Sequence, residues 1–560
     1  MAIIFDTETD GLNVLDPKIY GYAINTGDST TFITSNDYKK KFESFLDLYN
    51  DKRVVGHNVK FDLQVLKLHK EPYELFDTMV AEWLLYPDQK KYGLKKLAKK
   101  YWNEDTATYS ELINKYKPKG KKKAECCLDV VPFEDMKKYC IKDVDMTKKL
   151  FEKLQPMIDN NKYLSSIYYG VEMPFLRVLA KMELNGIFID KQMLEEMSDK
   201  NSKRIIELRG KVMAMAGEEF NLDSPKQLSE ILFTKLKIPI TRIRKTGNST
   251  DEKDLKALEK DYEIIKLLLE YRKLIKLDRT YLKSLPKFIR SDGRVHPSYN
   301  QIGTATGRIS CDSPNLQNIP ADELGGEIRK AFKPMKGNKF IIADYDQMEL
   351  RMLANVSNDK KLIWAFNNNV DIHRLTAQLL LGKDEVTDVE RKIGKTINFA
   401  IIYGQGASGL AKALEVPYAQ ARDFIYKYAC LYSGAWTWRK EAIENSHKTM
   451  VTETIIGRKR DLTKAEGFAD RLALNTPIQG SCSELVKIAM IRLHSALKDT
   501  DCLMLMQIHD ELVFECPEAK AEQYSVLVQG IMDSISVLDN VILKCPMKTE
   551  VIIADSWFDK

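Results

Sequence analysis

Four carboxylates and one phenol near the N-terminus form the first group of candidate catalytic residues. Asp6 and Glu8 stand two residues apart at the end of an apolar run that predicts a strand, so both side chains point to one face. Asp62 follows a second apolar run, and Tyr139 and Asp143 have the i, i+4 spacing that shares a helix face. Any one of these acids alone is typical of a turn or a helix cap. Together, such oxygen ligands suit Mg²⁺ or Mn²⁺ rather than zinc, and two ions can activate a water at a phosphodiester.

The second group of acids lies in the C-terminal half. Asp344 stands where an apolar strand passes into a predicted helix, and Asp510 stands at the acidic apex of a predicted β-hairpin. If these elements pack side by side, the two carboxylates are neighbours, and such a pair repels unless cations neutralise it. Two divalent ions there would suit in-line displacement at a phosphate. For either segment alone, an unrelated loop acid is the alternative interpretation.

A third segment has two cations and two aromatic residues at helical spacing. Arg391, Lys395, Phe399 and Tyr403 follow one another at intervals of four, so on a helix they form one slowly winding stripe. Arginine gives forked contacts to phosphate, lysine gives a point charge, and the aromatic rings offer area for stacking. The pattern fits a ligand with phosphates at one end and a base at the other. An ordinary amphipathic helix is the alternative.

The elements that must position these residues divide the chain into three blocks. Residues 1–155 alternate short apolar runs with helical patterns and predict an α/β domain; residues 156–295 predict a mostly helical block; residues 296–560 mix helices and strands. The expected strands are 2–5, 54–56, 340–346, 503–509 and 511–515, and the expected helices include 94–101, 136–154 and 261–285. Residues 245–250 predict an exposed tip.

Composition narrows the class of protein. The 560 residues are 44% hydrophobic and 30% charged, which is typical of globular domains and excludes collagen-like and disordered chains. No apolar run is long enough for a membrane span, no secretory signal is visible, and nine cysteines without a CxxC pair favour a reducing, cytoplasmic setting. The formal net charge is +6, and residues 90–123 hold twelve lysines against three acids. That run, with a predicted loop at 115–123, is either a solvated face or a groove for phosphates.

The ordered motifs resemble two known families. The N-terminal acids resemble the signature segments of the DnaQ-like (DEDD) 3′–5′ exonucleases, in the DEDDy subtype because of Tyr139. The segments around Asp344, Arg391–Gly404 and Asp510 resemble motifs A, B and C of the family A DNA polymerases, the DNA polymerase I type. Further ordered matches are 172–174, 185–187, 221–228, 245–247, 304–310, 314–320, 371–374 and 475–481.

The resemblance implies a multidomain α/β fold, with an RNase H-like exonuclease domain followed by a right-hand polymerase. The implied domains are the exonuclease at 1–155, thumb and connecting helices at 156–295, palm at 296–365, fingers at 366–470 and palm again at 471–560. The implied activity is DNA-directed DNA polymerase (EC 2.7.7.7) with 3′–5′ proofreading, using two Mg²⁺ or Mn²⁺ ions in each active site. The compact form resembles a phage or viral replicative enzyme, without a 5′-nuclease domain.

Residue roles are carried over from the same resemblance. Metal ligands would be Asp344 and Asp510 in the polymerase and Asp6, Glu8, Asp62 and Asp143 in the nuclease; Glu511, Lys395 and Tyr139 would also be catalytic. The incoming nucleotide would meet His373, Arg391, Lys395, Phe399, Tyr403, Gln347 and Glu349, the last crowding the sugar 2′ position. DNA would meet Arg308, Asn315, Asn318, Arg471, Asn475, Gln479, His509 and Lys245. Asp346 departs from the family's usual serine and would lie near the metals or face solvent.

The expected partners are primer–template DNA and dNTPs, with a monomeric chain, no membrane, and any helicase, primase or single-strand binding protein left unidentified. A nuclease with a decayed polymerase half, a single-subunit RNA polymerase and a non-enzymatic nucleic-acid-binding scaffold are the alternatives. Complete motifs argue against the first, Glu349 and the nuclease segments against the second, and two intact carboxylate sets against the third.

Overall fold

The structure is a computed structural model that describes the chain except residues 1, 28, 35–39, 41, 43, 45–52, 68–73, 245–246, 322 and 539–540. The chain forms two compact units. The first comprises Met1–Asn185, Tyr299–Cys311 and Ile341–Ile553, and the second comprises Gly186–Ser298, Asp312–Phe340 and Ala554–Lys560. Among the described helices, none combines the length and apolar character needed to cross a bilayer.

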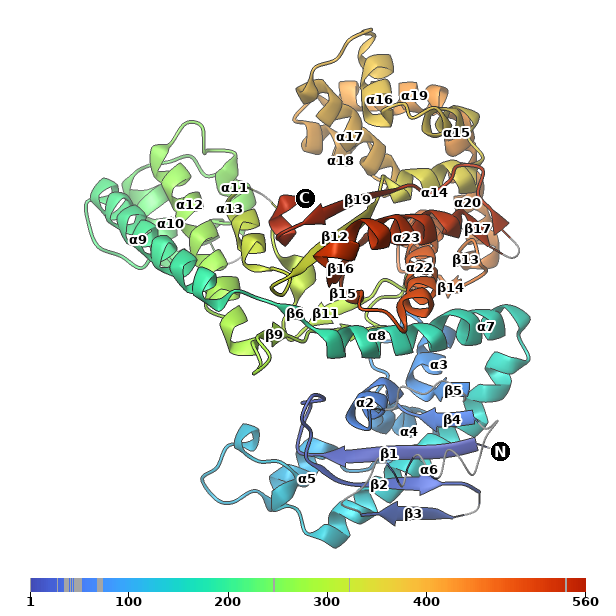
Figure 1. The fold of residues 1–560 in the computed structure, drawn as a ribbon. Helices are drawn as coiled ribbons and strands as arrows, with labels where there is room; N and C mark the ends of the chain where they lie inside the picture. Colours follow the sequence, from blue (N-terminus) through green and yellow to red (C-terminus); the bar gives the residue numbers. More distant parts are fainter. Residues whose placement is uncertain are drawn as a thin grey trace. The chain divides into compact units, whose positions relative to one another are not determined.

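The N-terminal part of the first unit is built on a mixed five-stranded sheet of order β3-β2-β1-β4-β5. Its strands are β1 Ala2–Thr9, β2 Ile19–Asn25, β3 Thr30–Ile33, β4 Arg53–Gly56 and β5 Glu74–Asp77. The central strand β1 runs antiparallel to β2 and parallel to β4 (Figure 1). Its apolar residues Ile3, Ile4 and Phe5 are fully buried, as their uninterrupted run predicts for a central strand. The strands expected at 2–5 and 54–56 are confirmed.

Helices pack on this sheet and carry part of the first acidic group. They are α2 Val59–Val65, α3 Thr78–Leu85, α4 Leu94–Trp102, α5 Tyr109–Tyr116 and α6 Phe133–Asp159. The long helix α6 packs along β1, β2 and β3 and buries an apolar face that includes Cys140, Val144, Leu150 and Leu154. The expected helices are confirmed and are longer. The loop expected at 115–123 is wrong at its start, because α5 continues to Tyr116 and the chain leaves the helix only at Lys117.

A nearly continuous helical stretch leaves this domain. It comprises α7 Lys162–Ile167, a π-helical turn at Tyr168–Glu172 and α8 Met173–Asn185. Helix α7 is exposed or half-buried except at Ile167, whereas most residues from Ile167 to the end of α8 are buried, including Tyr168, Glu172 and Leu176. The π-helical turn aims Glu172 inward, where it is fully buried.

The second unit is mainly helical, as expected for 156–295. Its main helices, α9 Lys191–Ala216 and α12 Glu263–Leu277, pack against each other around Leu208, Val212 and Leu268. The expected helix 261–285 begins at Glu263 and passes into a π-helical turn at Asp278–Leu282. Shorter elements are α10 Pro225–Ser229, α11 Glu252–Lys256, α13 Glu323–Gly326 and the strand pairs β6 Ile187–Phe188 with β9 Arg294–Val295 and β7 Ile243–Arg244 with β8 Gly247–Asn248.

The C-terminal part of the first unit is built on a four-stranded sheet of order β15-β16-β12-β19. The strands are β12 Asn338–Tyr345, β15 Leu503–Ile508, β16 Glu511–Pro517 and β19 Thr549–Ala554, and the expected strands are confirmed. The β15–β16 hairpin closes with Ile508 opposite Glu511, which leaves His509 and Asp510 in the turn. Strand β12 ends at Tyr345, one residue earlier than expected, and α14 Met348–Ser357 follows.

Helices between β12 and β15 carry the stripe and its neighbours (Figure 1). They are α15 Lys360–Asn367, α16 Ile372–Leu381, α17 Asp388–Ile402, α18 Ala407–Leu414, α19 Tyr418–Leu431, α20 Ser433–Thr449, α21 Ala469–Asn475 and α22 Ser481–Leu497. A hairpin of β13 Val451–Glu453 and β14 Lys459–Asp461 follows α20, a π-helical turn at Thr476–Gly480 precedes α22, and α23 Ala521–Asp533 follows β16. The remaining strand pairs are β10 Ser298–Asn300 with β11 Ser310–Asp312 and β17 Val537–Leu538 with β18 Val541–Ile542.

Candidate active sites

Three elements bring the N-terminal acids together. Asp6 and Glu8 lie on β1, Asp62 lies on α2, and Tyr139 and Asp143 lie on α6. Asp62 Oδ1 accepts hydrogen bonds from the Thr7 backbone N–H at 3.0 Å and the Thr7 hydroxyl at 2.5 Å. These bonds tie the helix to the strand between the two β1 acids. Ligand atoms of Asp6, Glu8 and Cys140 all lie within 4.8 Å of one another. We call Asp6, Glu8, Asp62, Tyr139 and Asp143 the N-terminal acidic site.

Electrostatics in this site favour a cation. Burial raises the pKa of Asp6 to about 7, and burial and the neighbouring carboxylates raise the pKa of Glu8 and Asp62 well above the ordinary range. Oε1 of Glu8 is buried without a hydrogen-bond partner among the described residues. Burial also raises the pKa of the Cys140 thiol, so the donor set consists of carboxylate oxygens. Closely spaced, buried oxygen donors with an unpartnered oxygen fit a divalent metal ion.

Lys95 belongs to this site and was not predicted to do so. Its ammonium, on α4, forms an ion pair with Asp143 and lies 4.4 Å from the ring centroid of Tyr139. Burial lowers the pKa of Lys95 to about 8, against the opposing effect of Asp6 and Glu8. The sequence predicts a solvated face or a phosphate groove for the lysine run, and neither describes Lys95, whose side chain is turned inward. In the sequence, Lys95 differs from the other lysines only in being the second residue of an amphipathic helix.

The C-terminal sheet brings Asp344 and Asp510 to one place. Asp344 is the penultimate residue of β12, and the next residue, Tyr345, donates its backbone N–H to the carbonyl of Asp510 at 3.4 Å. The hairpin turn holding Asp510 therefore lies beside the end of β12. Glu511, the first residue of β16, is buried, whereas His509 is exposed and has a left-handed backbone with φ 58°. We call Asp344 and Asp510 the C-terminal acidic pair.

Asp346 is engaged by a buried arginine. Its carboxylate accepts a hydrogen bond from Arg351 Nη2 at 2.8 Å and one from Gln347 Nε2 at 3.1 Å. Since β12 ends at Tyr345, the strand parity that relates Asp346 to Asp344 does not extend to it. Asp346 therefore takes part in a local ion pair, and Gln347, with φ 50°, turns the chain into α14.

Glu349 in the first turn of α14 receives two hydrogen bonds. Arg308 Nη2 donates to its Oε1 at 2.7 Å, and the Tyr403 hydroxyl donates to its Oε2 at 2.6 Å. Glu349 is only 6% exposed, so both carboxylate oxygens are fixed. Tyr403 lies about fifty positions from Glu349 in the chain, and Arg308 lies about forty positions from it. No local sequence pattern could predict these two contacts.

The stripe lies on one helix. Arg391, Lys395 and Phe399 lie on α17, and Tyr403 caps its C-terminal end with its ring stacked 6.5 Å from that of Phe399. Arg391 Nε pairs with Asp371 at 2.6 Å, and Asp371 caps α16. The cationic end of the stripe is therefore held in place by the N-cap residue of the preceding helix, α16.

His373 on α16 completes the face. Its ring lies 5.9 Å from Phe399, and its Nδ1 lies 3.0 Å from Asn398 Nδ2. Burial, then the charge of Arg391, lowers the pKa of His373 to about 4, so the ring is neutral near pH 7. Asn398, fully buried, is a further residue of this face that the sequence interpretation missed.

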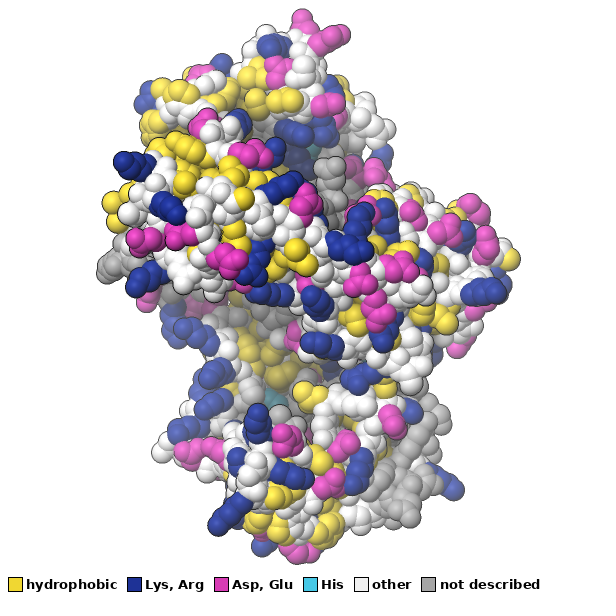
Figure 2. Space-filling view, turned by 90° about the vertical axis from the view of Figure 1, so that its left-hand side faces the viewer, with side chains coloured by type: hydrophobic (Ala, Val, Ile, Leu, Met, Phe, Trp, Pro, Cys, Tyr) yellow, Lys and Arg dark blue, Asp and Glu magenta, His cyan; other side chains and the backbone are white. Residues whose placement is uncertain are grey.

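The residues expected to contact DNA do not form one cluster, and they lie in both units of the chain. Gln479 Oε1 accepts from the Thr306 hydroxyl at 3.0 Å, and Asn475, at the end of α21, has a buried Oδ1 without a partner among the described residues. Arg471 lies one turn before Asn475. Asn315 and Asn318 are exposed residues of the second unit, and Lys245 lies outside the described residues. Figure 2 shows lysine and arginine side chains spread over a whole face, with acidic side chains between them.

Comparisons with known proteins match both parts of the chain. The family model described as DNA polymerase family A matches residues 191–559, and the one described as 3'-5' exonuclease matches residues 1–159. The chain is 37% identical over 532 residues to DNA polymerase I of Treponema pallidum (strain Nichols), covering 91% of this chain and 52% of that protein. It is 34% identical over 604 residues to DNA polymerase I of Synechocystis sp. (strain ATCC 27184 / PCC 6803 / Kazusa), covering 100% of this chain and 60% of that protein.

A solved structure gives the same result. The POL domain of Pol1 from M. smegmatis, in complex with DNA primer–template and dNTP, matches with a TM-score of 0.87 and 28% identity, covering 100% of this chain and 96% of that one. The chain spans about half the length of the curated relatives it matches. These relatives are bacterial, and a phage origin stays a prediction.

Proposed function

We propose that this chain, which belongs to DNA polymerase family A, extends a DNA primer with dNTPs along a template and removes mispaired 3′ nucleotides in its N-terminal domain. The observation that carries the proposal is the C-terminal acidic pair in the same unit as the α17 stripe, with Glu349 bonded to both Arg308 and Tyr403. Polymerases and exonucleases of these families are metal-dependent, and the carboxylate sets described above fit that requirement.

In the polymerase site, Asp344 and Asp510 would hold the metal ions, for which we propose two Mg²⁺ or Mn²⁺ ions. When bound, such ions activate the primer hydroxyl and neutralise charge on the phosphates. Arg391 and Lys395 orient the triphosphate, with neutral His373 beside them. Glu511, buried next to Asp510, supports the same site.

The remaining residues of that face shape the nucleotide pocket. Phe399 and Tyr403 pack on the base and the templating position, supported by their stacked rings. Glu349, fixed by Arg308 and Tyr403, crowds the sugar 2′ position and rejects ribonucleotides. Gln347 turns the chain so that Glu349 follows in the first helical turn.

The N-terminal acidic site performs the 3′–5′ removal. Asp6, Glu8, Asp62 and Asp143 would hold the metal ions, whose chemistry would be to make a water nucleophilic at neutral pH. Tyr139 orients the attacking water with its hydroxyl, because burial and the charges of Glu8 and Asp6 raise its pKa and keep it protonated.

DNA is held through contacts that do not read sequence. Arg308, Asn475, Gln479 and His509 meet the minor groove at the primer end, where all base pairs present acceptors in similar places. Arg471, Asn315, Asn318 and Lys245 contact the rest of the primer–template. The domain limits that go with this assignment are those of the expected exonuclease, thumb, palm and fingers.

Primer extension with dNTPs and rNTPs tests the proposal. We expect wild-type protein to extend a primer with dNTPs in Mg²⁺ and to incorporate rNTPs far less well. Degradation without any extension would identify a nuclease with a decayed polymerase half, and preferential rNTP incorporation would identify an RNA polymerase. Either outcome contradicts the proposed function.

A further inference from the structure

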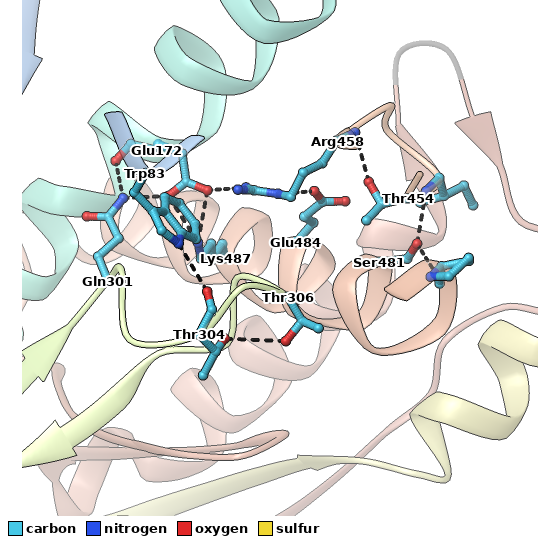
Figure 3. A network of polar contacts seen from close by, with 12 residues as sticks. Trp83, Glu172, Gln301, Thr304, Thr306, Thr454, Arg458, Ser481, Glu484 and Lys487 are labelled. Carbon is cyan, nitrogen blue, oxygen red and sulfur yellow. Dashed lines mark hydrogen bonds and ion pairs between the residues drawn. The ribbon is translucent and has the colours of Figure 1, made fainter. Parts of the chain in front are cut away.

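A buried cluster of charges lies in the first unit outside both acidic sites. Glu172 ends the π-helical turn Tyr168–Glu172, Arg458 stands in the turn of the β13–β14 hairpin, and Glu484 and Lys487 lie on α22 (Figure 3). All four are at most 3% exposed. Burial of unpaired charge is unfavourable, so a cluster like this depends on the pairing of its charges. Among the described residues, only Arg458 Nη1 and Glu484 Oε2 of the cluster are buried without a hydrogen-bond partner. We call these four residues the Glu172 cluster.

Glu172 is the centre of the cluster. Its carboxylate receives Lys487 Nζ at 2.9 and 3.0 Å and also pairs with Arg458 Nη2. Arg458 Nε donates in turn to Glu484 Oε1 at 2.7 Å. Although burial opposes ionisation, Lys487 and Arg458 outweigh it and lower the pKa of Glu172 to about 2. Two acids and two bases therefore balance one another within the cluster.

The cluster holds the start of a loop. Gln301 Nε2 donates to the Glu172 backbone carbonyl at 2.8 Å and to Glu172 Oε2 at 2.5 Å. The loop continues over the two cations at Gly307: with φ +84°, a Cβ there would lie 3.7 Å from both Arg458 Cζ and Lys487 Nζ. Residues 301–308, which we call the 301–308 segment, contain neither helix nor strand and depend on such contacts for their shape.

Trp83, from helix α3 of the N-terminal domain, holds the middle of the segment. Its indole Nε1 donates to the Thr304 carbonyl at 3.1 Å, as Figure 3 shows. Arg458 and Lys487 lie over the same ring, at 4.8 and 5.2 Å from its centroid. The ring therefore joins the cations of the cluster to the segment through cation–π contacts and one hydrogen bond.

The far end of the segment reaches the proposed polymerase site. Thr304 Oγ1 donates to the Arg308 carbonyl at 2.8 Å, which folds the segment back on itself. Thr306 then donates to Gln479, and Arg308 donates to Glu349. A shift of the segment would move both contacts together.

We propose that Trp83 and Glu172 are positioning residues for the polymerase site, which act through the 301–308 segment on Arg308. The inference rests on the proposed function. It makes a tryptophan of the nuclease domain a determinant of how the polymerase discriminates a paired from a mispaired primer end. Trp83 acts without touching DNA, by fixing the backbone that presents Arg308.

Trp83→Phe is the decisive variant, because it keeps a six-membered aromatic ring in the core and removes the N–H donor together with the five-membered part of the buried indole. Asp88→Asn is its matched control: Asp88 pairs with Arg460 Nη2 at 2.6 Å and also joins the N-terminal domain to the β13–β14 hairpin, and both of its carboxylate oxygens accept from Arg460 rather than from the segment. Each change is made in the 560-residue chain carrying Asp6→Ala and Glu8→Ala, so that nuclease activity does not remove mispaired ends.

Single-turnover extension of matched and 3′-mispaired primers gives the main readout. We expect Trp83→Phe to slow matched extension about three- to tenfold, the loss typical of one hydrogen bond, and to lower the ratio of matched to mispaired extension. Asp88→Asn should change neither the rate of matched extension nor the ratio of matched to mispaired extension by more than twofold. In the Arg308→Ala background, Trp83→Phe adds less than twofold, since its effect passes through Arg308. Glu172→Gln gives the same change of ratio together with a lower melting temperature.

Results that contradict the inference can be told apart from results that contradict the proposed function. An unchanged ratio in Trp83→Phe, an equal effect of Asp88→Asn, or full additivity with Arg308→Ala overturns the inference while wild-type extension still supports the proposed function. Absence of extension by the wild-type chain overturns the proposed function and the inference with it. Single-strand degradation by Trp83→Phe with the nuclease acids intact should equal wild type, and a loss there would identify a general defect of the N-terminal domain.

Discussion

The Tyr403 hydroxyl donates a hydrogen bond to Glu349 Oε2 at 2.6 Å, which joins the C-terminal end of α17 to the first turn of α14. Burial and the bond to Glu349 raise the pKa of Tyr403, so the phenol remains the donor. With Arg308 on its other oxygen, Glu349 cannot rotate away without breaking two hydrogen bonds. The proposed block against a sugar 2′-hydroxyl is thus a rigid one.

Glu349→Ala should lower DNA synthesis about ten- to hundredfold, because hydrogen bonds to a charged group contribute about 1.5–3 kcal/mol. Its residual activity should discriminate less between dNTPs and rNTPs, since the side chain no longer fills the 2′ face. Tyr403→Phe leaves Arg308 as the remaining hydrogen-bond donor to the Glu349 carboxylate. Its rate of DNA synthesis and its discrimination against rNTPs should lie between those of Glu349→Ala and wild type. Steady-state incorporation of both nucleotide types measures this. Unchanged discrimination in Glu349→Ala would put the sugar gate at another residue.

Asp344→Ala or Asp510→Ala should abolish dNTP incorporation and leave degradation of single-stranded 3′ ends intact. Each carboxylate belongs to the C-terminal acidic pair and has no part in the N-terminal acidic site. Primer extension and release of labelled 3′ nucleotides, measured on the same preparation, test the two activities together. Near-normal extension by either variant contradicts the assignment of the pair.

Local patterns were enough to predict the acids but not their partners. Strand parity placed Asp6 with Glu8, and a spacing of four placed Tyr139 and Asp143 on α6, because both rules depend only on backbone geometry. The end of β12 was misjudged by one residue, and that residue is Asp346, whose pairing with Arg351 decides its role.

Tertiary contacts account for what the sequence did not reveal. Lys95 reaches Asp143 across 48 positions, and Asn398 reaches His373 across 25. Trp83 and Thr304 are 221 positions apart in the chain, and no sequence pattern links the two segments. Such residues look like ordinary helix positions until the fold brings their partners to them.

The unfolding of the protein in EDTA should depend on Asp6 and Glu8 in a definite direction. Burial raises the folded-state pKa of Asp6 to about 7 from 3.8, so the folded state binds more protons between these values. The contribution of Asp6 to the free energy of unfolding therefore falls as pH rises from about 4 to 7 and stays low above it. Mg²⁺ should restore stability near pH 8 more than near pH 5. Because the entropy of unfolding scales with length, each kcal/mol should appear as about 1 °C in melting temperature for a chain of 560 residues.

The control for this experiment is Asp6→Asn with Glu8→Gln. His57, whose pKa burial lowers to about 4, contributes the opposite slope, because its stability contribution is lost as pH falls below its unfolded value of 6.5. The double variant keeps His57, so the difference between variant and wild type isolates the acids. We expect the variant to melt higher than wild type in EDTA near pH 8 and to lose the Mg²⁺-dependent shift. A shift equal to that of wild type would place the cation elsewhere.

Asp6→Ala with Glu8→Ala should remove 3′–5′ degradation and leave polymerisation nearly intact. The two acids are half of the four carboxylates proposed to hold metal in the N-terminal acidic site, and their loss leaves Asp62 bonded to Thr7 and Asp143 paired with Lys95. Without bound metal, hydroxide is not available at neutral pH, since metal ions lower the pKa of water from 15.7 towards about 7 in favourable sites. Tyr139→Phe should be milder, because it removes an orienting hydroxyl and no ligand.

The measurement is release of labelled nucleotides from a mispaired primer without dNTPs, with matched-primer extension as the control. Release at the wild-type rate by the double variant would make this cluster of acids structural, whereas release lost together with extension would mean that the two sites are not independent.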